Sequence, residues 1–221
     1  MIVQQSIMSP QNTETRERLI ETARDLFHHQ GYTPTGIAQI LKKAEVNSGS
    51  LYYYFPTKED LLIAVLEWYR DHIDSALIDL HTANISDPIE KVFGLMDGYR
   101  QLLLMFEFEL GCPIGALALE MSNTHPAVRN LVLINFEQWI DTIEGFFRQA
   151  EDRFPEGTDC RALAIHVLTT MEGGMMLAKT YRSTSYFDTT ISQLRTYIDS
   201  LLQSGTDWNA PKRHPSIQES L

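Results

Sequence analysis

The sequence predicts an all-α protein. Apolar residues recur every three or four positions along most of the 221 residues, which is the spacing of one face of a helix. Strict alternation of apolar and polar residues, the pattern of a half-buried strand, extends over no useful length. Residues that begin or end helices stand between the periodic segments, and Gly31, Asn47 and Asp87 are examples. Together these observations predict a chain of helices separated by short turns.

The first sixty residues predict three helices, with a tight turn between the second and the third. The first helix carries an apolar stripe and ends at Gly31, which suits a left-handed C-terminal cap. Thr35 is expected to cap the second helix and Asn47 the third, which runs to about Phe55. Only residues 45–46 separate the second helix from the cap of the third. This close connection is typical of a helix-turn-helix.

The third helix has an inward apolar face and an outward face that suits a nucleic acid. Leu51 and Phe55 are four residues apart and share one side, whereas Gly49 and Tyr53 point the opposite way. Gly49 has no side chain to hold the backbone away from a groove, and a tyrosine hydroxyl reaches phosphates or base edges. The alternative is that the three consecutive tyrosines form a half-buried aromatic patch.

The residues after this helix suggest a phosphate contact. Pro56 ends the helix, and Thr57 with Asp60 predicts a capping box at the start of a fourth helix. Lys58 then lies in the first turn, where a positive charge is unfavourable at the positive end of the helix. A phosphate between Lys58 and the exposed amides would remove that cost, so Lys58 is a candidate phosphate contact.

At these residues the chain resembles the TetR family of bacterial transcriptional regulators. The matching residues are Thr35-Gly36-Ile37-Ala38, Val46 through Phe55, and Lys58-Glu59-Asp60-Leu61-Leu62, in the order and spacing of the family. The resemblance implies a DNA-binding domain, joined by a long helix to an all-helical domain that binds an inducer and dimerises. The implied partner is a double-stranded, pseudo-palindromic operator. The expected DNA contacts are Thr35, Asn47, Ser48, Gly49, Ser50, Tyr52, Tyr53, Tyr54 and Lys58.

Two residues depart from the family pattern. Many members carry Lys or Arg where this chain has Ser48, and Gly36 is a flexible choice for the first turn of the second helix.

The net charge of −11 is also unfavourable for DNA binding, but residues 1–60 contribute only −1 of it and residues 61–221 contribute −10. We therefore expect modest affinity per protomer, with dimerisation needed to span two half-sites about one helical turn of DNA apart.

The composition also limits location and chemistry. No run of about eighteen apolar residues is present, which argues against a membrane-spanning helix. The N-terminus lacks the pattern of a signal peptide, so a cytoplasmic protein is expected. Cys112 and Cys160 have neither disulfide-framework nor zinc-ligand spacing, and no His or carboxylate cluster has metal spacing. We expect no metal and no cofactor.

Beyond residue 60 the apolar spacing predicts further helices and a dimer interface. The expected spans are a connecting helix from 59 to 80, a helix capped by Asp87 with Pro88, about 115–122, a long helix after Thr124 or His125, about 158–182 and 185–203. The last two are dense in small and apolar residues, and Gly173 and Gly174 allow close helix approach. By resemblance we expect the homodimer there; ordinary intramolecular core is the alternative. The expected divisions are a mobile N-terminus 1–12, a helix-turn-helix domain 13–60, a helical domain 61–204 and a mobile tail 205–221.

An inducer pocket is expected inside the second domain, as in the family. The candidate lining residues are Trp68, Tyr99, Phe106, Cys112, Met121, Phe136, Trp139, Met171 and Met175. Their character suggests an apolar or aromatic inducer, although aromatic and methionine side chains at helical spacing more often fill plain core. The expected function is thus a ligand-responsive repressor. An architectural or division-control DNA-binding protein without an inducer is the alternative.

Cys112 is a further candidate for ligand sensing. The segment Gly111-Cys112-Pro113-Ile114-Gly115 resembles a branch of TetR regulators in which a cysteine senses electrophiles or oxidants. The N-terminus of the following helix is expected to lower the pKa of the thiol and so increase its reactivity. Small apolar filler is the other interpretation of this cysteine. A cysteine-dependent enzyme is disfavoured, because His125 and His166 show no pattern that places a base beside Cys112.

Overall fold

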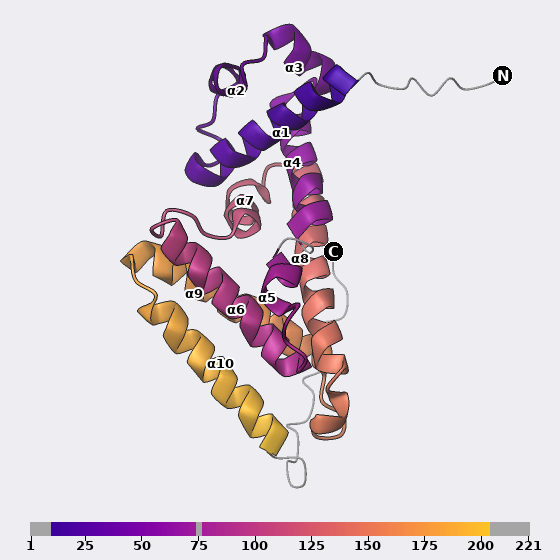
Figure 1. Ribbon diagram of the computed structural model, residues 1–221. Coiled ribbons are helices and arrows are strands. Elements are labelled where there is room, and N and C mark those ends of the chain that lie inside the picture. Colours follow the sequence, from indigo (N-terminus) through magenta and orange to yellow (C-terminus); the bar gives the residue numbers. More distant parts are fainter. Residues whose placement is uncertain (1–9, 74–76, 204–221) are drawn as a thin grey trace, which may run out of the picture.

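The computed structural model describes residues 10–73 and 77–203, and every regular element among them is helical (Figure 1). The elements are α1 (Pro10–Gln30), α2 (Ile37–Ala44), α3 (Ser48–Tyr54), α4 (Lys58–Ile73), α5 (Asp79–Thr82), α6 (Pro88–Met105), α7 (Pro113–Met121), α8 (Pro126–Arg148), the 3-10 turn η2 (Glu151–Arg153), α9 (Cys160–Tyr181) and α10 (Ser185–Gln203). The all-α prediction is confirmed for these residues. None of these helices is long and apolar enough to cross a membrane.

Local sequence signals set most of the helix boundaries as predicted. Gly31 ends α1 with a φ of +88°, and Asp87 caps α6 by accepting from two backbone N–H groups while Pro88 opens the helix. Thr57 and Asp60 form the predicted capping box before α4, with distances of 2.7 to 3.1 Å. Two boundaries differ from the prediction, namely the start of α1 and the extent of the connecting helix.

The N-terminal and connecting segments differ from the expected divisions in two places. Helix α1 begins at Pro10, inside the segment 1–12 that was expected to be mobile, and residues 1–9 and 204–221 lie outside the described residues. The connecting helix expected from 59 to 80 is described as α4 and α5, because residues 74–76 also lie outside. Leu80, at the end of the expected connecting helix, is 74% exposed. Helix α5 packs against α6.

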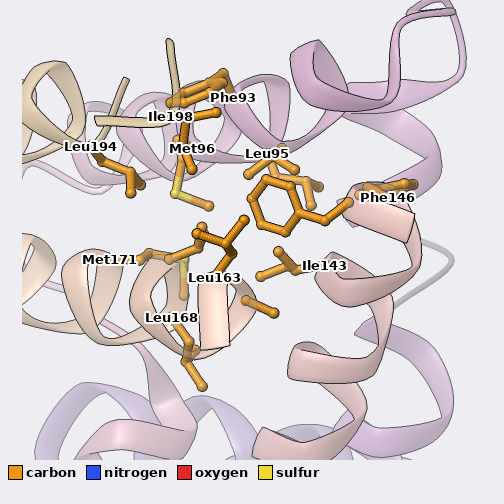
Figure 2. Packing of buried hydrophobic residues seen from close by; sticks show 14 of the residues in the cluster. Phe93, Leu95, Met96, Ile143, Phe146, Leu163, Leu168, Met171, Leu194 and Ile198 are labelled. Carbon is orange, nitrogen blue, oxygen red and sulfur yellow. The ribbon is translucent and has the colours of Figure 1, made fainter. Parts of the chain in front are cut away.

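Two groups of buried residues form the core. The first joins α1, α2, α3 and α4 to α7 and the start of α8, so the N-terminal helices share their core with two helices of the second domain. The second group lies among α6, α8, α9 and α10. Figure 2 shows part of it, with Phe93, Met96, Ile143, Leu163, Leu194 and Ile198 packed together. Cys112 and Phe136 pack against both groups.

The second domain is built around α8. This helix packs against α4 on one side and α9 on the other, and α9 packs in turn against α10. Figure 1 shows α10 at the outer edge of the molecule, far from α2 and α3. Helix α7 lies between the N-terminal helices and the α6–α9 layer, which places it to contact both parts of the chain.

Candidate nucleic-acid interface and ligand cavity

The two faces of α3 separate as the helical spacing predicts. Leu51 has no exposed surface and Phe55 is 3% exposed, whereas Tyr53 is 72% and Tyr52 is 51% exposed. The Asn47 side chain caps the helix by accepting a hydrogen bond from the Ser50 N–H at 2.8 Å. Burial of two apolar side chains and a cap at the first turn therefore hold this short helix while its tyrosines face outward.

The small residues at the start of α3 leave its backbone open. Ser48 and Gly49 are exposed, and a Cβ at Gly49 would meet only the Asn47 Oδ1, at 3.3 Å. Tyr54 is half-buried and packs edge-to-face against Tyr53, with ring centroids 4.9 Å apart. Two exposed phenol rings beside an accessible backbone can contact phosphates and base edges in a groove.

Lys58 is engaged with the loop between α1 and α2. Its Nζ donates to the Tyr32 carbonyl at 2.5 Å and lies 4.0 Å from the centre of the Tyr32 ring. Burial lowers the pKa of Lys58 below its ordinary value, against the charge of Glu120, which raises it. The positive charge at the start of α4 is thus compensated within the protein, and a phosphate is not required for that purpose.

Glu120, near the end of α7, holds the same loop from the other side. Its Oε2 accepts from the Tyr32 N–H at 3.0 Å, and its Oε1 accepts from the Thr33 N–H at 2.6 Å. Burial alone would raise the pKa of Glu120, but the hydrogen bonds from Thr33 and Tyr32 and the charge of Lys58 lower it overall. We call Glu120, the backbone of Tyr32 and Thr33, and Lys58 the loop clamp.

A second link joins α1 to the residues before α7. The His28 Nε2 donates to the Gly111 carbonyl at 2.8 Å, and burial lowers the pKa of His28, so the ring is neutral near pH 7. Helix α7 is therefore tied to the N-terminal domain at both of its ends, by His28 before its first turn and by the loop clamp at its last.

A cavity of about 440 Å³ lies where the two domains meet. Its walls come from the described helices of both domains, and most of its lining side chains are apolar or aromatic. They are Arg24, His28, Trp68, Tyr69, Leu77, Leu80, His81, Tyr99, Leu102, Leu103, Phe106, Leu110, Gly111, Cys112, Pro113, Ile114, Phe136, Trp139, Leu168, Met171, Glu172 and Met175. This size and character suit a small organic molecule.

A second cavity of about 510 Å³ adjoins the first. Six residues line both cavities, namely His28, Gly111, Cys112, Phe136, Glu172 and Met175. The wall between the two spaces thus carries one thiol, one imidazole and one carboxyl group among apolar neighbours.

Cys112 and Glu172 meet at the N-terminus of α7. Cys112 caps the helix, with its Sγ accepting from the Gly115 N–H at 3.3 Å. A Cβ at Gly115 would come within 2.3 Å of the Glu172 Oε2, so only glycine leaves room for that carboxyl group. The other oxygen, Glu172 Oε1, is buried and has no hydrogen-bond partner among the described residues.

Comparison with known proteins identifies the family. Residues 19–65 match the family described as bacterial regulatory proteins, tetR family, and residues 88–193 match the C-terminal domain described as transcriptional regulator LmrA/YxaF-like. The chain is 31% identical to the HTH-type transcriptional regulator LmrA of Bacillus subtilis (strain 168) over 179 residues, which cover 78% of this chain and 90% of LmrA. The chain belongs to the TetR family.

Two further similarities agree with this assignment. The HTH-type transcriptional repressor DhaR of Mycobacterium sp. (strain GP1) is 30% identical over 58% of this chain and 63% of DhaR. A TetR transcriptional regulator from Chloroflexus aurantiacus J-10-fl superposes with a TM-score of 0.76 and 26% identity, covering 86% of this chain and 97% of that one. This TetR-family protein is therefore a DNA-binding transcriptional regulator, and the comparisons do not support the enzyme alternative.

The structure of this TetR-family regulator sorts the predicted DNA contacts by accessibility. Exposed are Asn47, Ser48, Gly49, Tyr52 and Tyr53, while Ser50, Tyr54 and Lys58 are half-buried. Thr35 is fully buried, and its hydroxyl donates to the Gly31 carbonyl at 2.6 Å. The prediction that Thr35 caps α2 is wrong, because Gly36 occupies the cap position without a side-chain hydrogen bond. A buried Thr35 side chain also has no surface for DNA.

Eight of the nine predicted pocket residues line the first cavity. These are Trp68, Tyr99, Phe106, Cys112, Phe136, Trp139, Met171 and Met175. Met121 is 1% exposed, packs within the N-terminal core and lines neither of the two cavities. Sequence reasoning missed His28 and Glu172. A lone carboxylate between Met171 and Met175 on an apolar stripe was the available signal for Glu172.

The expectation that Cys112 has a lowered pKa is wrong. Burial, followed by the charge of Glu172, raises the pKa of the Cys112 thiol well above its ordinary value. The N–H groups of Gly115 and Ile114 at the start of α7 favour the thiolate but are outweighed. Cys112 is thus a protonated thiol near neutral pH, which slows its reaction with electrophiles.

Proposed function

We propose that this regulator is a repressor that leaves its operator when an apolar or aromatic inducer occupies the cavity at the domain junction. The proposal rests on the observation that helices of both domains supply side chains to the cavity wall. Arg24 and His28 come from α1 of the DNA-binding domain, whereas Met171 and Met175 come from α9. A molecule in this space contacts both domains at once, so its binding energy can depend on how the domains are arranged.

Repression, as opposed to activation, is supported by the name of a relative. DhaR, a relative of this chain, is named as a repressor. A cavity ligand also needs only to favour the arrangement that does not bind DNA, and a preference of about 5.5 kcal/mol is enough to reverse a 99:1 population. Release by a ligand therefore requires no chemistry beyond differential binding.

The proposed DNA contact is the outward face of α3, presented by a dimer to two half-sites of a pseudo-palindrome. Tyr52 and Tyr53 are its most exposed large side chains, and Asn47, Ser48 and Gly49 border them. Tyr54 and Ser50 are proposed as flanking contacts. Lys58 is proposed to support the loop between α1 and α2, with any phosphate contact made from that bound position.

The dimer is proposed to form through α9 and α10. Large apolar or aromatic side chains are exposed on these helices, namely Ile165, Met176, Tyr181, Tyr186 and Tyr197. The two glycines of α9 divide their roles. A Cβ at Gly174 would come within 2.9 Å of the Thr190 Oγ1 in α10 of the same chain, whereas a Cβ at Gly173 would meet nothing within 4 Å. Gly174 thus serves the intramolecular packing, whereas Gly173, which also lines the second cavity, leaves space beside it for a partner helix.

The test measures binding of the protein to the DNA upstream of its own gene, with fluorescence anisotropy as the readout and the salt concentration held fixed. Addition of apolar aromatic compounds is expected to release the DNA from the wild-type protein. Met175→Trp, which places a larger side chain at the wall shared by both cavities, is expected to keep DNA binding and to weaken the release. Met105→Trp, at an exposed residue of α6 outside both cavities, is the matched control and is expected to respond like the wild type.

Two outcomes would contradict this proposal. Release from Met175→Trp at the wild-type ligand concentration would show that the inducer binds elsewhere. Occupancy of many genomic sites with no response to any compound would favour an architectural protein.

Covalent induction through Cys112 is the second candidate, because this thiol lines both cavities. The raised pKa of Cys112 predicts slow modification near neutral pH. Release by a small electrophile from the wild type but not from Cys112→Ser, together with a mapped adduct on Cys112, would support covalent induction over reversible binding.

A further inference from the structure

Within the proposed inducer site, on which this inference rests, one polar group stands out. Glu172 lines both cavities among Met171, Met175 and Phe136, and its Oε1 is buried without a hydrogen-bond partner in the described part of the chain. A buried polar atom that lacks a partner is unfavourable in the empty site. A ligand that donates a hydrogen bond to this carboxyl group removes that cost, which an entirely apolar ligand cannot do.

Among the described residues, no basic side chain of either cavity, His81 included, forms an ion pair with Glu172. Arg24 lies over the Trp68 ring, with its guanidinium carbon 3.7 Å from the ring centre. His28 donates to the Gly111 carbonyl and is neutral near pH 7, and Lys179 is exposed. Glu172 has no ion-pair partner among the residues described. Burial accordingly raises the pKa of Glu172, and its contact with the Cys112 thiol opposes only part of that rise.

Glu172 borders both cavities, so a ligand in either one can reach its carboxyl group. Gly115, which has no side chain, leaves room for the Glu172 Oε2 at this wall. The remaining walls are apolar and aromatic, with the Trp68 and Trp139 rings among them, and they suit a flat hydrocarbon body.

We propose that the inducer is an arylalkyl amine, with an aromatic body and an aliphatic amino group, whose protonated nitrogen pairs with the carboxylate of Glu172. An ammonium group supplies both the missing donor and the opposite charge, and such charge-assisted hydrogen bonds are about twice as strong as neutral ones. An alcohol supplies the donor alone, and a carboxylate places a like charge beside Glu172. The three ligand types therefore rank in a defined order.

The test measures that order with one hydrocarbon skeleton. Probes are 4-phenylbenzylamine, 4-biphenylmethanol and biphenyl-4-carboxylate, added to the full chain without DNA and followed by tryptophan fluorescence and calorimetry. The amine is expected to bind the wild type at least about tenfold more tightly than the alcohol, and the carboxylate most weakly. Glu172→Gln keeps the shape of the side chain and is expected to remove the preference for the amine.

Two further variants keep the test decisive. Glu172→Asp retains the charge and is expected to retain the ranking, and Lys179→Gln, at the rim of the second cavity, is expected to leave it unchanged or to strengthen it. Thermal unfolding of each variant shows that it folds. The inference is overturned if the amine does not bind, if the alcohol or carboxylate binds as tightly, or if Glu172→Gln keeps the wild-type preference.

The outcomes for the inference and for the proposed function are distinguishable. Glu172-dependent binding of the amine without release of operator DNA would support the ligand class and contradict its role as inducer. Release of DNA by neutral aromatics with no preference for the amine would support the repressor proposal and overturn the ligand class.

Discussion

At the scale of single residues, two side chains of α3 that are two positions apart have different roles, one in packing and one in the proposed DNA contact. Leu51 is fully buried and holds the helix, whereas Tyr53 is 72% exposed and its ring packs against Tyr54. Tyr53→Ala is therefore expected to weaken operator binding severalfold while lowering the free energy of unfolding by no more than about 1 kcal/mol. Anisotropy with operator DNA and urea unfolding measure the two quantities separately.

Leu51→Ala is the matched comparison. It removes a fully buried side chain and is expected to cost about 2–5 kcal/mol of stability. Tyr53→Phe keeps the ring and removes the hydroxyl, so it separates hydrogen bonding from stacking. A Tyr53→Ala protein that unfolds more easily but binds DNA normally would mean that the tyrosines are structural.

Asn47 combines a structural and an electrostatic role at the start of α3. Its side chain accepts from the Ser50 N–H, so Asn47→Ala is expected to lower stability by about 1 kcal/mol. Asn47→Asp keeps the cap but brings a negative charge toward the phosphates. We expect near wild-type unfolding and weaker operator binding from it, measured by the same two assays. Normal DNA affinity of the Asp variant would place this cap away from the duplex.

The residues that sequence reasoning placed correctly are those whose partners lie within a turn of helix. Asn47 accepts a hydrogen bond from the Ser50 N–H, and Asp60 accepts one from the Thr57 N–H. Asp87 accepts from the N–H groups of Ile89 and Glu90. Cys112 was misjudged because its pKa is set by burial and by Glu172, sixty residues further along the chain. Helix spacing contains no information about such a partner.

At the scale of elements, α7 is the connection between the cavities and the DNA-binding domain. Its first turn carries Cys112 at the wall shared by both cavities, and its last carries Glu120 in the loop clamp. We propose that this helix of nine residues, held at both ends, passes a displacement of one end to the other. Sequence spacing predicted this helix, but the partners of Glu120 lie about 88 residues away in the chain and could not be read from it.

The loop clamp predicts a variant in which ligand binding and DNA release are uncoupled. Glu120→Gln keeps one acceptor oxygen but loses the charge beside Lys58, and Glu120→Ala loses both. We expect both variants to bind a cavity ligand with wild-type affinity and to release operator DNA less completely, the alanine variant least. Ligand titration with and without DNA measures the coupling. Wild-type coupling in Glu120→Ala would exclude this route.

The same contact predicts a dependence on acid. Because the pKa of Glu120 is lower in the folded chain than in an unfolded one, its ionised form stabilises the fold. That contribution is present above the unfolded value of about 4.3 and is lost as the pH falls through the lower folded value. The stability difference between wild type and Glu120→Gln should therefore shrink in this acid window, as urea unfolding at stepped pH would show. A constant difference would contradict the assignment.

At the scale of the whole molecule, charge and assembly act together. The described N-terminal domain belongs to a segment with a charge of only −1, while the remainder carries −10, so phosphate repulsion is concentrated away from α3. A near-neutral contact surface gains little from counterion release, which favours cooperation between two protomers. The composition predicted this division of charge, but not which apolar side chains stay exposed. Ile165 and Tyr197 lie in helices that the spacing predicts, but only the packed structure shows that their side chains are on the surface.

Ile165 provides the test of assembly. It is 43% exposed on α9, and Ile165→Glu would place a charge without a partner inside the proposed interface, where desolvation is costly. We expect the dimer dissociation constant to rise by at least about tenfold, as a cost of 1.4 kcal/mol or more requires. Operator affinity should fall with it, because a single protomer contacts one half-site. Leu133→Glu adds the same charge at a 56% exposed residue of α8 and is expected to remain dimeric in sedimentation equilibrium. If both variants stay dimeric and bind DNA normally, α9 does not form the interface, and another surface must hold the two DNA-binding domains together.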